Sequence, residues 1–218
     1  MKMLKPLPPP KPGSRAPSSN PRNFEGVYTS ETMPQFFNNS LPLTPAAQER
    51  QARDRQRMAE GKPTGGLAAI CRPQPTFALG SDLFPGEVTQ NDHQVIFLNE
   101  EHRTRLNVYL DREHPKGLAP SYFGDSVGRW EGDTLVIDTI GFNGRDDKIS
   151  EKAHVIMRVR KIDNGQRLEI ITTTEDPLIY TRPITDTAYS RWNPDVQMLE
   201  FQCEENLEGA MEGLDVSE

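Results

Sequence analysis

The stretch that most constrains the fold is 124–139, with the sequence GDSVGRWEGDTLVIDT. Its second half, 134–139, is rich in β-branched side chains, whose crowding at Cβ favours an extended backbone over a helix. Leu135 and Ile137 point to one face of this strand and Val136 points to the other, whereas a strand with one wet face alternates more strictly. The pattern therefore predicts a central strand that is covered on both faces.

From residue 83 onward, apolar residues recur at every second position and turn signals are frequent. This pattern predicts nine strands, at 85–90, 94–99, 104–111, 128–131, 134–140, 153–162, 167–175, 185–192 and 196–203. Short links make consecutive strands antiparallel neighbours, because a parallel return needs a longer crossover. A meander this long curls, and closing it removes exposed edges, so we predict an antiparallel up-and-down β-barrel.

The flanking segments divide the chain into three parts. Residues 1–23 are dense in proline and cannot join a sheet, so we expect a flexible Pro-rich arm. Residues 24–206 form one domain, which opens on an irregular lead-in at 24–37. The Glu- and Gly-rich end, 207–218, is expected to be a loose acidic tail.

A single short helix is predicted at about 44–60. Thr44 suits the N-cap, and Pro45 suits the first helical position, where its missing N–H has no cost. The helix is markedly polar, so we expect it to lie on the surface as a brace for the barrel.

The overall charge limits the partners of the chain. With 32 acidic and 25 basic residues, the net charge is −7, which disfavours nucleic acid and anionic membranes as partners. No apolar run approaches the roughly 20 residues that a transmembrane helix needs. We expect a small-molecule ligand or substrate, no nucleic acid and no transmembrane segment; the oligomeric state stays open, with a homodimer as one answer.

Neither a metal nor a cofactor is expected. The four histidines are scattered, and no Cys-x-x-Cys or His-x-x-x-His spacing occurs. Phosphate loops and dinucleotide fingerprints are absent from the sequence. Cys71 and Cys203 would pair only in an oxidising compartment, so their state stays open.

Residues 124–143 also follow a specific pattern, GxSVGRWEGDTLVIDTxGFN. Further matching residues run in the same order along 41–206, and they are Leu43-Thr44-Pro45, Cys71-x-Pro73, Tyr109-x-Asp111 with His114-Pro115, Ser150 with His154, Arg158, Asp176-Pro177 with Tyr180-Thr181-x-Pro183, and Glu200-x-x-Cys203-x-Glu205-Asn206. In these residues the chain resembles a large family of uncharacterised bacterial β-rich proteins, many of them exported. The resemblance implies a shared β-rich fold and little about activity, and we expect a barrel of calycin or lipocalin type.

Two positions depart from the family pattern. Asp125 stands where the family usually has histidine, and Met157 stands before Arg158 where the family usually has glutamate. The sequence begins without an apolar signal segment, so we expect a cytoplasmic protein, recruited to a different role from its relatives. A trimmed leader would instead make it periplasmic or secreted.

The candidate catalytic residues are Asp138, His154 and Arg158. A barrel wide enough for a ligand is expected to hold its site inside. If the mixed face of 153–162 lines that cavity, Asp138 can approach His154 as a base with its orienting group, and Arg158 can hold an oxyanion or carboxylate. The alternative is a solvated face or a satisfied hydrogen-bond cluster.

A second set of side chains supplies candidate ligand contacts. As aromatic or apolar groups they can line a cavity or belong to an ordinary core, and they are Tyr109, Tyr122, Trp130, Met157, Tyr180 and Trp192. For Trp130 the preferred interpretation is structural, because its setting resembles the tryptophan that closes the bottom of calycin barrels. The carboxylates of Glu131 and Asp133 and those of Glu175 and Asp176 lie at strand ends, where two of them could share acid and base roles. The alternative is that they cap turns or face water, as acidic residues at turns commonly do.

Two functions from different classes follow. The first is a cofactor-independent acid–base enzyme, a lyase, isomerase or cyclase, acting on a hydrophobic or polyfunctional metabolite. The second is a non-catalytic, lipocalin-like carrier of a hydrophobic ligand.

Overall fold

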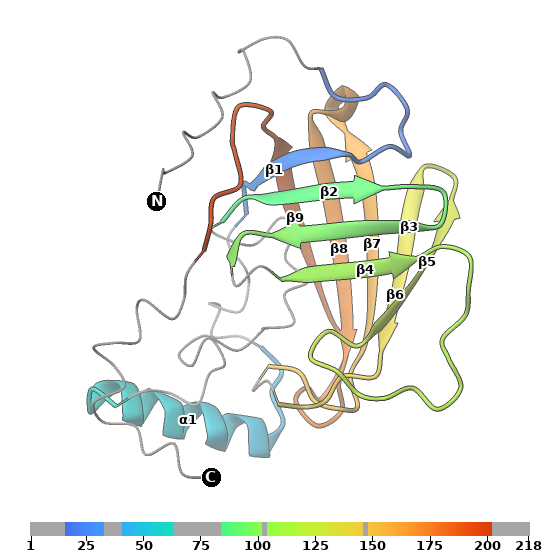
Figure 1. Ribbon diagram of the computed structural model, residues 1–218. Coiled ribbons are helices and arrows are strands. Elements are labelled where there is room, and N and C mark those ends of the chain that lie inside the picture. Colours follow the sequence, from blue (N-terminus) through green and yellow to red (C-terminus); the bar gives the residue numbers. More distant parts are fainter. Residues whose placement is uncertain (1–15, 33–40, 63–83, 102–103, 146–147, 202–218) are drawn as a thin grey trace, which may run out of the picture.

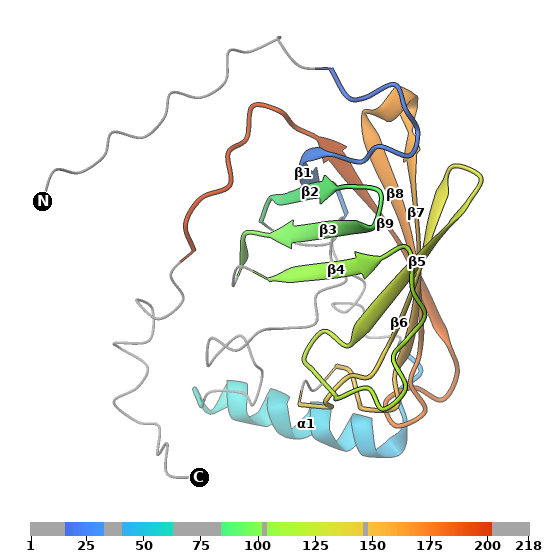
Figure 2. The ribbon, with the colours of Figure 1, turned by 45° about the vertical axis from the view of Figure 1, so that its right-hand side comes forward.

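The computed structural model describes residues 16–32, 41–62, 84–101, 104–145 and 148–201. Within these ranges nine strands close into one barrel, and the one α-helix lies outside it (Figures 1 and 2). The strands are β1 (Gly26–Ser30), β2 (Gly86–Gln90), β3 (Gln94–Asn99), β4 (Arg105–Tyr109), β5 (Asp125–Glu131), β6 (Thr134–Ile140), β7 (His154–Ile162), β8 (Arg167–Glu175) and β9 (Ile184–Trp192). A mostly β chain closed into a barrel is therefore confirmed.

The barrel contains one parallel pair, which the prediction of an antiparallel meander missed. β4 and β5 run in the same direction and pair only at Val108 with Ser126 and Tyr109 with Val127. All other neighbouring strands are antiparallel. The long connection 110–124 provides the crossover of roughly a dozen or more residues that parallel strands require.

Two predicted elements were wrong. The lead-in at 24–37 contains β1, which pairs with β2 on one side and with β9 on the other and so closes the barrel. No strand occurs over 196–201, the described part of the strand predicted at 196–203. β1 has five residues and follows a Pro-rich segment, so the sequence around it gives almost no indication of a strand. The strand forms because it pairs with β2 and β9, which are distant in the sequence.

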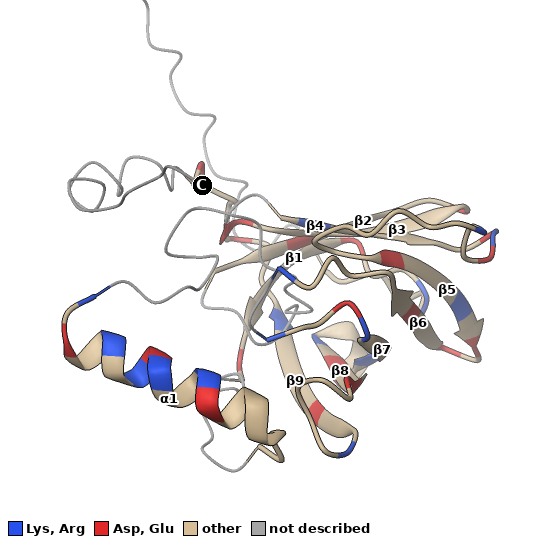
Figure 3. Cartoon of the chain, turned by 90° about the horizontal axis from the view of Figure 1, so that it is seen from below, with Lys and Arg blue, Asp and Glu red and all other residues tan. Residues whose placement is uncertain are grey.

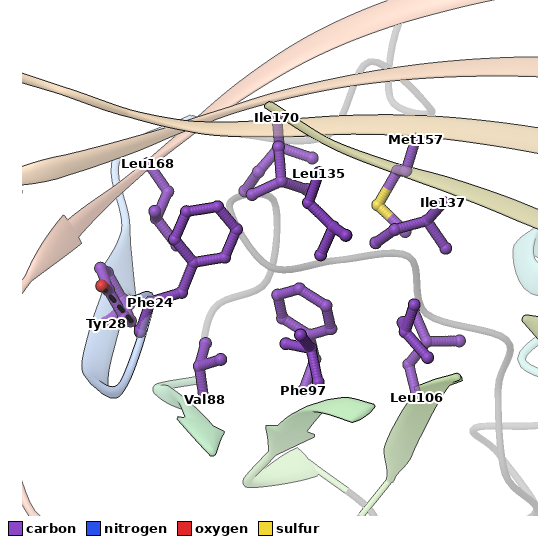
Figure 4. Packing of buried hydrophobic residues seen from close by; sticks show 13 residues of the cluster. Phe24, Tyr28, Val88, Phe97, Leu106, Leu135, Ile137, Met157, Leu168 and Ile170 are labelled. Carbon is purple, nitrogen blue, oxygen red and sulfur yellow. Dashed lines mark hydrogen bonds between the residues drawn. The ribbon is translucent and has the colours of Figure 1, made fainter. Parts of the chain in front are cut away.

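The interior of the barrel holds apolar side chains that point inward from the strands (Figure 4). Leu135, Ile137 and Met157 come from adjacent strands, and Phe97 and Leu106 lie across from them in Figure 4. Burying such side chains is the main favourable term in folding, at about 1.5 to 3 kcal/mol each. These groups fill space that the sequence pattern had assigned to a ligand.

At the end of the barrel where β5 turns into β6, the rings of Phe24 and Trp130 pack together with their centroids 5.3 Å apart. Tyr28 lies beside Phe24 and donates its hydroxyl hydrogen to the Phe24 carbonyl at 3.0 Å. Burial raises the pKa of Tyr28, so this hydroxyl remains a donor. The structural interpretation of Trp130 agrees with this packing.

Residues 16–23 of the Pro-rich arm are held against the same end. The Lys161 ammonium donates to the Ser18 carbonyl at 2.8 Å, and the Gln90 side chain donates to the Arg22 carbonyl at 2.9 Å. Partial burial lowers the pKa of Lys161. This part of the arm is therefore fixed to the barrel.

The helix, α1 (Pro45–Ala59), begins where the sequence predicts. The Thr44 hydroxyl accepts the Ala47 backbone N–H at 3.3 Å, and Pro45 takes the first helical position. Basic and acidic side chains follow one another along the helix (Figure 3). Ala47, its buried residue, packs with Ile179 and Tyr180 in a small cluster separate from the barrel core. The helix is a surface element, as expected.

Replacing Thr44 with alanine is expected to reduce the free energy of unfolding by about 1 kcal/mol. The hydroxyl caps α1 and also donates to the Leu178 carbonyl at 2.9 Å, so its loss weakens both the helix start and its attachment. Urea unfolding followed by circular dichroism measures the change. Thr44→Ser keeps the hydroxyl and should stay close to wild type; equal losses in both variants would contradict the capping role.

Candidate functional site

A cluster of polar side chains lies on the outer face of the barrel. Asp125 comes from β5, Asp138 from β6 and His154 from β7, while Arg112 and His114 come from the crossover between β4 and β5. We refer to these five residues as the Asp–His cluster. It joins three neighbouring strands to the segment that passes over them.

The local structure explains why the two aspartates share this face. Ser126 and Thr139 are buried and share a hydrogen bond of 2.8 Å, so the preceding residue on each strand points to the opposite side, outward. Gly124 begins the turn into β5 at φ +66°, and a Cβ there would come within 2.5 Å of the Ile140 carbonyl oxygen. Only glycine fits this close approach, which fixes where Asp125 leaves the crossover.

Asp138 and His154 lie together, as their positions in the sequence suggested. His154 Nε2 is 2.9 Å from Asp138 Oδ1, and 41 % of the histidine side chain is exposed. A carboxylate at neutral pH only accepts hydrogen bonds, so Nε2 carries the proton and Nδ1 keeps a lone pair. Nδ1 has no partner among the described residues. The pair therefore has the arrangement of a base held by an orienting carboxylate.

His114 links the two aspartates. Its Nδ1 is 2.7 Å from Asp125 Oδ2, and its Nε2 is 3.4 Å from Asp138 Oδ1. Arg112 makes a two-pronged contact with Asp125 and stacks over the Tyr109 ring at 4.0 Å. Burial alone would raise the pKa of Asp125, but the hydrogen bonds from Arg112 and His114 outweigh it and lower that pKa.

Arg158 lies apart from this cluster. On β7 the alternating residues Val155, Met157 and Val159 are buried in the barrel, so the mixed face that carries His154 and Arg158 points outward. The expectation that this face lines an internal cavity was wrong. Arg158 is four positions after His154, which is about 13 Å along the strand.

The Arg158 guanidinium is instead engaged on the outer surface. It donates to Glu131 at 2.9 Å, and Glu131 also accepts from Arg129 at 2.8 Å. These hydrogen bonds from Arg158 and Arg129 lower the pKa of Glu131. In the register, Val136 lies opposite both arginines and is almost fully buried, as expected if their aliphatic stems cover it.

The candidate ligand contacts do not form one wall. Met157 belongs to the barrel core, and Trp130 and Trp192 pack against that core. Tyr180 is buried beside α1. Tyr122 lies half-buried in the crossover. Of the six, Tyr109 lines the pocket described next.

A pocket of about 590 Å³ lies between the beginning of β4 and the segment that leads into β5. β4 and β5 pair at only two positions, so the barrel wall is interrupted there. The lining combines groups from both strands and the crossover: Thr104, Arg105, Leu106, Asn107, Tyr109, Ser121, Phe123, Gly124, Asp125 and Ser126. Because Asp125 belongs to both, the pocket and the Asp–His cluster adjoin.

Sequence reasoning missed Arg112, His114 and Asp125 as members of one site. His114 was present in the family pattern, and Asp125 was noted as a departure from it. These residues come together because Arg112 and His114, in the crossover, contact Asp125 on β5. That contact depends on the parallel pairing of β4 and β5, which the sequence did not indicate.

Two properties of the described residues bear on function. They contain no group of three or more His, Cys, Asp or Glu side chains that is arranged to hold a metal ion. They also contain no helix both long enough and apolar enough to cross a membrane. Cys71 and Cys203 lie outside the described residues. The chain matches no protein-family model, and no curated protein is similar to it in sequence.

Proposed function

We propose that this chain is a small-molecule-binding β-barrel that acts as a cofactor-independent acid–base enzyme. The observation that carries the proposal is the position of Asp125, which lines the pocket and also belongs to the Asp–His cluster. A ligand in the pocket therefore lies beside a chain of hydrogen bonds that leads through His114 and Asp138 to His154. Concave sites with a few polar groups are the usual places for small-molecule chemistry.

In this mechanism His154 is the general base. His154 does not line the pocket, so the substrate has to extend from the pocket past Asp125 and over the outer face of β6. There the Nδ1 lone pair takes a proton from a carbon or hydroxyl of the substrate, and Asp138 stabilises the imidazolium that forms. The electron pair left on the substrate expels a group, shifts a double bond or closes a ring, and His154 then returns the proton. This sequence describes a lyase, isomerase or cyclase and needs no external oxidant. Arg158 has no part in it, because it lies about 13 Å from His154 along β7 and is hydrogen-bonded to Glu131.

A non-catalytic carrier is the second candidate. It is favoured by the pocket lining, in which Arg105, Tyr109 and Asp125 are the ionisable groups and Asp125 is already engaged by Arg112 and His114. In a carrier, the Asp–His cluster serves only to hold the crossover onto the barrel. The two candidates differ in whether His154 removes a proton.

We also propose that the barrel is of calycin or lipocalin type and related to the exported bacterial family that the signature resembles. The closed strand order and the packing of Trp130 at one end support this assignment. The parallel pair β4–β5 departs from a simple meander.

The decisive experiment measures proton abstraction directly, so the reaction product need not be identified. A panel of carbon acids (ketones, 2-oxo acids, β-keto esters and lactones) is incubated with the protein in D₂O, and deuterium incorporation is followed by NMR. We expect at least one compound to exchange, and His154→Gln to slow that exchange about 100-fold or more.

The matched control is His93→Gln. His93 also faces a carboxylate, with Nδ1 at 2.8 Å from Asp111 Oδ2, but it is more exposed and lies outside the cluster. This variant should exchange at the wild-type rate. Equal rates in wild type and His154→Gln would exclude the proposed base, and saturable binding without exchange would establish the carrier.

A further inference from the structure

The edge of β4 that faces the pocket is open over its first half. β3 and β4 are antiparallel, and the bonds from Asn99 N–H to the Thr104 carbonyl (2.9 Å) and from Leu110 N–H to the His93 carbonyl (2.8 Å) identify the pairs that exchange hydrogen bonds. Because such pairs alternate, even-numbered β4 residues bond to β3. The backbone groups of Arg105 and Asn107 therefore point the other way.

The parallel Val108–Ser126 pair uses the groups of the flanking residues, so the Asn107 carbonyl accepts from β5. No described strand meets the Asn107 N–H or the two backbone groups of Arg105. β5 reaches β4 only at Val108 and Tyr109, and both Arg105 and Asn107 line the pocket. In the described chain, the pocket therefore presents two backbone N–H donors, from Arg105 and Asn107, and one carbonyl acceptor, from Arg105, in extended geometry. Buried or half-buried backbone groups of this kind normally find a partner.

The charge of the pocket is uneven. The Asp125 carboxylate forms an ion pair with Arg112, which compensates its charge, and it also contacts His114. Arg105 is exposed, and no described carboxylate lies within ion-pair distance of it. The uncompensated charge of the lining is therefore the positive charge of Arg105.

We propose that the pocket binds a small molecule that carries a carboxylate next to an N–H or O–H donor, as in a hydroxy acid or an N-acyl amino acid. The Arg105 guanidinium holds the carboxylate through its planar fork, and backbone N–H groups of the β4 edge assist. The Arg105 carbonyl accepts the neighbouring donor. This carbonyl would repel the additional oxygens of a phosphate dianion, which favours the carboxylate.

The dimensions agree with such a ligand. A volume of about 590 Å³ lies within the range of roughly 300 to 1,000 Å³ that is usual for small-molecule sites. Val108 pairs with Ser126, so Asn107 lies level with Asp125, and Arg105 lies about 7 Å further along the strand. A carboxylate on Arg105 thus directs the rest of the molecule toward the Asp–His cluster. This inference rests on the proposed function, because it names the class of substrate for the same site.

Paired probes test the inference by titration followed by NMR. N-acetylphenylalanine carries the carboxylate, N-acetylphenylalanine amide lacks the charge, and phenyl phosphate replaces the carboxylate by phosphate. Wild-type protein should bind the acid at least tenfold more tightly than the amide or the phosphate, with shifts at the Asn107 amide. Arg105→Gln should weaken acid binding at least tenfold and leave amide binding unchanged, and Arg105→Lys should lie between.

Arg182→Gln, which removes an exposed arginine outside the pocket, is the matched control and should bind like wild type. Equal binding of acid and amide, tighter binding of the phosphate, binding of no probe, or a preference that survives Arg105→Gln would each overturn the inference. The result is separate from the exchange experiment. An Arg105-dependent preference with exchange unaffected by His154→Gln leaves the ligand class standing and removes the proposed base.

Discussion

Replacing Asp176 with alanine is expected to lower the free energy of unfolding by about 3 to 5 kcal/mol. Only 2 % of this residue is exposed. Its Oδ2 accepts the Ser150 backbone N–H at 2.7 Å, and its Oδ1 accepts the Ser150 hydroxyl at 2.7 Å and the Leu178 backbone N–H at 3.1 Å. Removing the carboxylate leaves these donors without an acceptor away from water.

Urea unfolding monitored by tryptophan fluorescence measures this loss. Asp195→Ala is the matched control, because Asp195 is exposed, and its change should stay within about 0.5 kcal/mol. Asp176→Asn keeps one oxygen acceptor and should lie between the two. If Asp176→Ala were as stable as the control, the carboxylate would have no structural role, and its alternative interpretation as half of a catalytic pair would regain support.

Replacing Asp125 with asparagine is expected to lower the free energy of unfolding by about 2 to 3 kcal/mol at neutral pH and to flatten its decline in acid. The hydrogen bonds from Arg112 and His114 lower the pKa of Asp125 despite its burial. A carboxyl with a lowered folded-state pKa adds stability that is fully present above its unfolded pKa, near 3.9. That stability is lost as the pH falls through the lower, folded-state pKa.

Unfolding curves recorded from pH 7 down to pH 2.5 give the comparison. Wild type should lose stability below about pH 4 more steeply than Asp125→Asn. Asp111→Asn is the control, because Asp111 faces His93 in an exposed pair and should leave the acid limb unchanged. Parallel acid limbs in wild type and Asp125→Asn would show that this carboxylate does not stabilise the crossover.

The segment 134–140 shows what local signals can provide. Its β-branched residues and double-sided apolar pattern gave a strand that is buried on both faces, and β6 has the predicted bounds. β3 and β8 were predicted as well, for the same reason. The start of α1 was correct because a threonine cap and a following proline act within one turn of the helix.

Only part of the candidate site could be predicted from such local sequence patterns. Asp138 and His154 lie on adjacent strands joined by a short connection, so their approach could be anticipated. The sequence could not predict which face of β7 points inward. Both faces carry apolar residues, and the choice depends on the side chains that pack against β7 in the core. Arg158 was placed in the site for that reason, and the structure assigns it to the outer surface with Glu131.

The amino-acid sequence by itself determined that the chain forms short strands with one polar helix, because period-two patterns, turn residues and caps act over a few neighbouring residues. The tertiary structure alone decided that β1 closes the barrel, that β4 and β5 run parallel, and that a pocket opens between them. These features depend on pairing between residues far apart in the chain. Such pairing is selected by the packing of the whole core, which no local pattern contains.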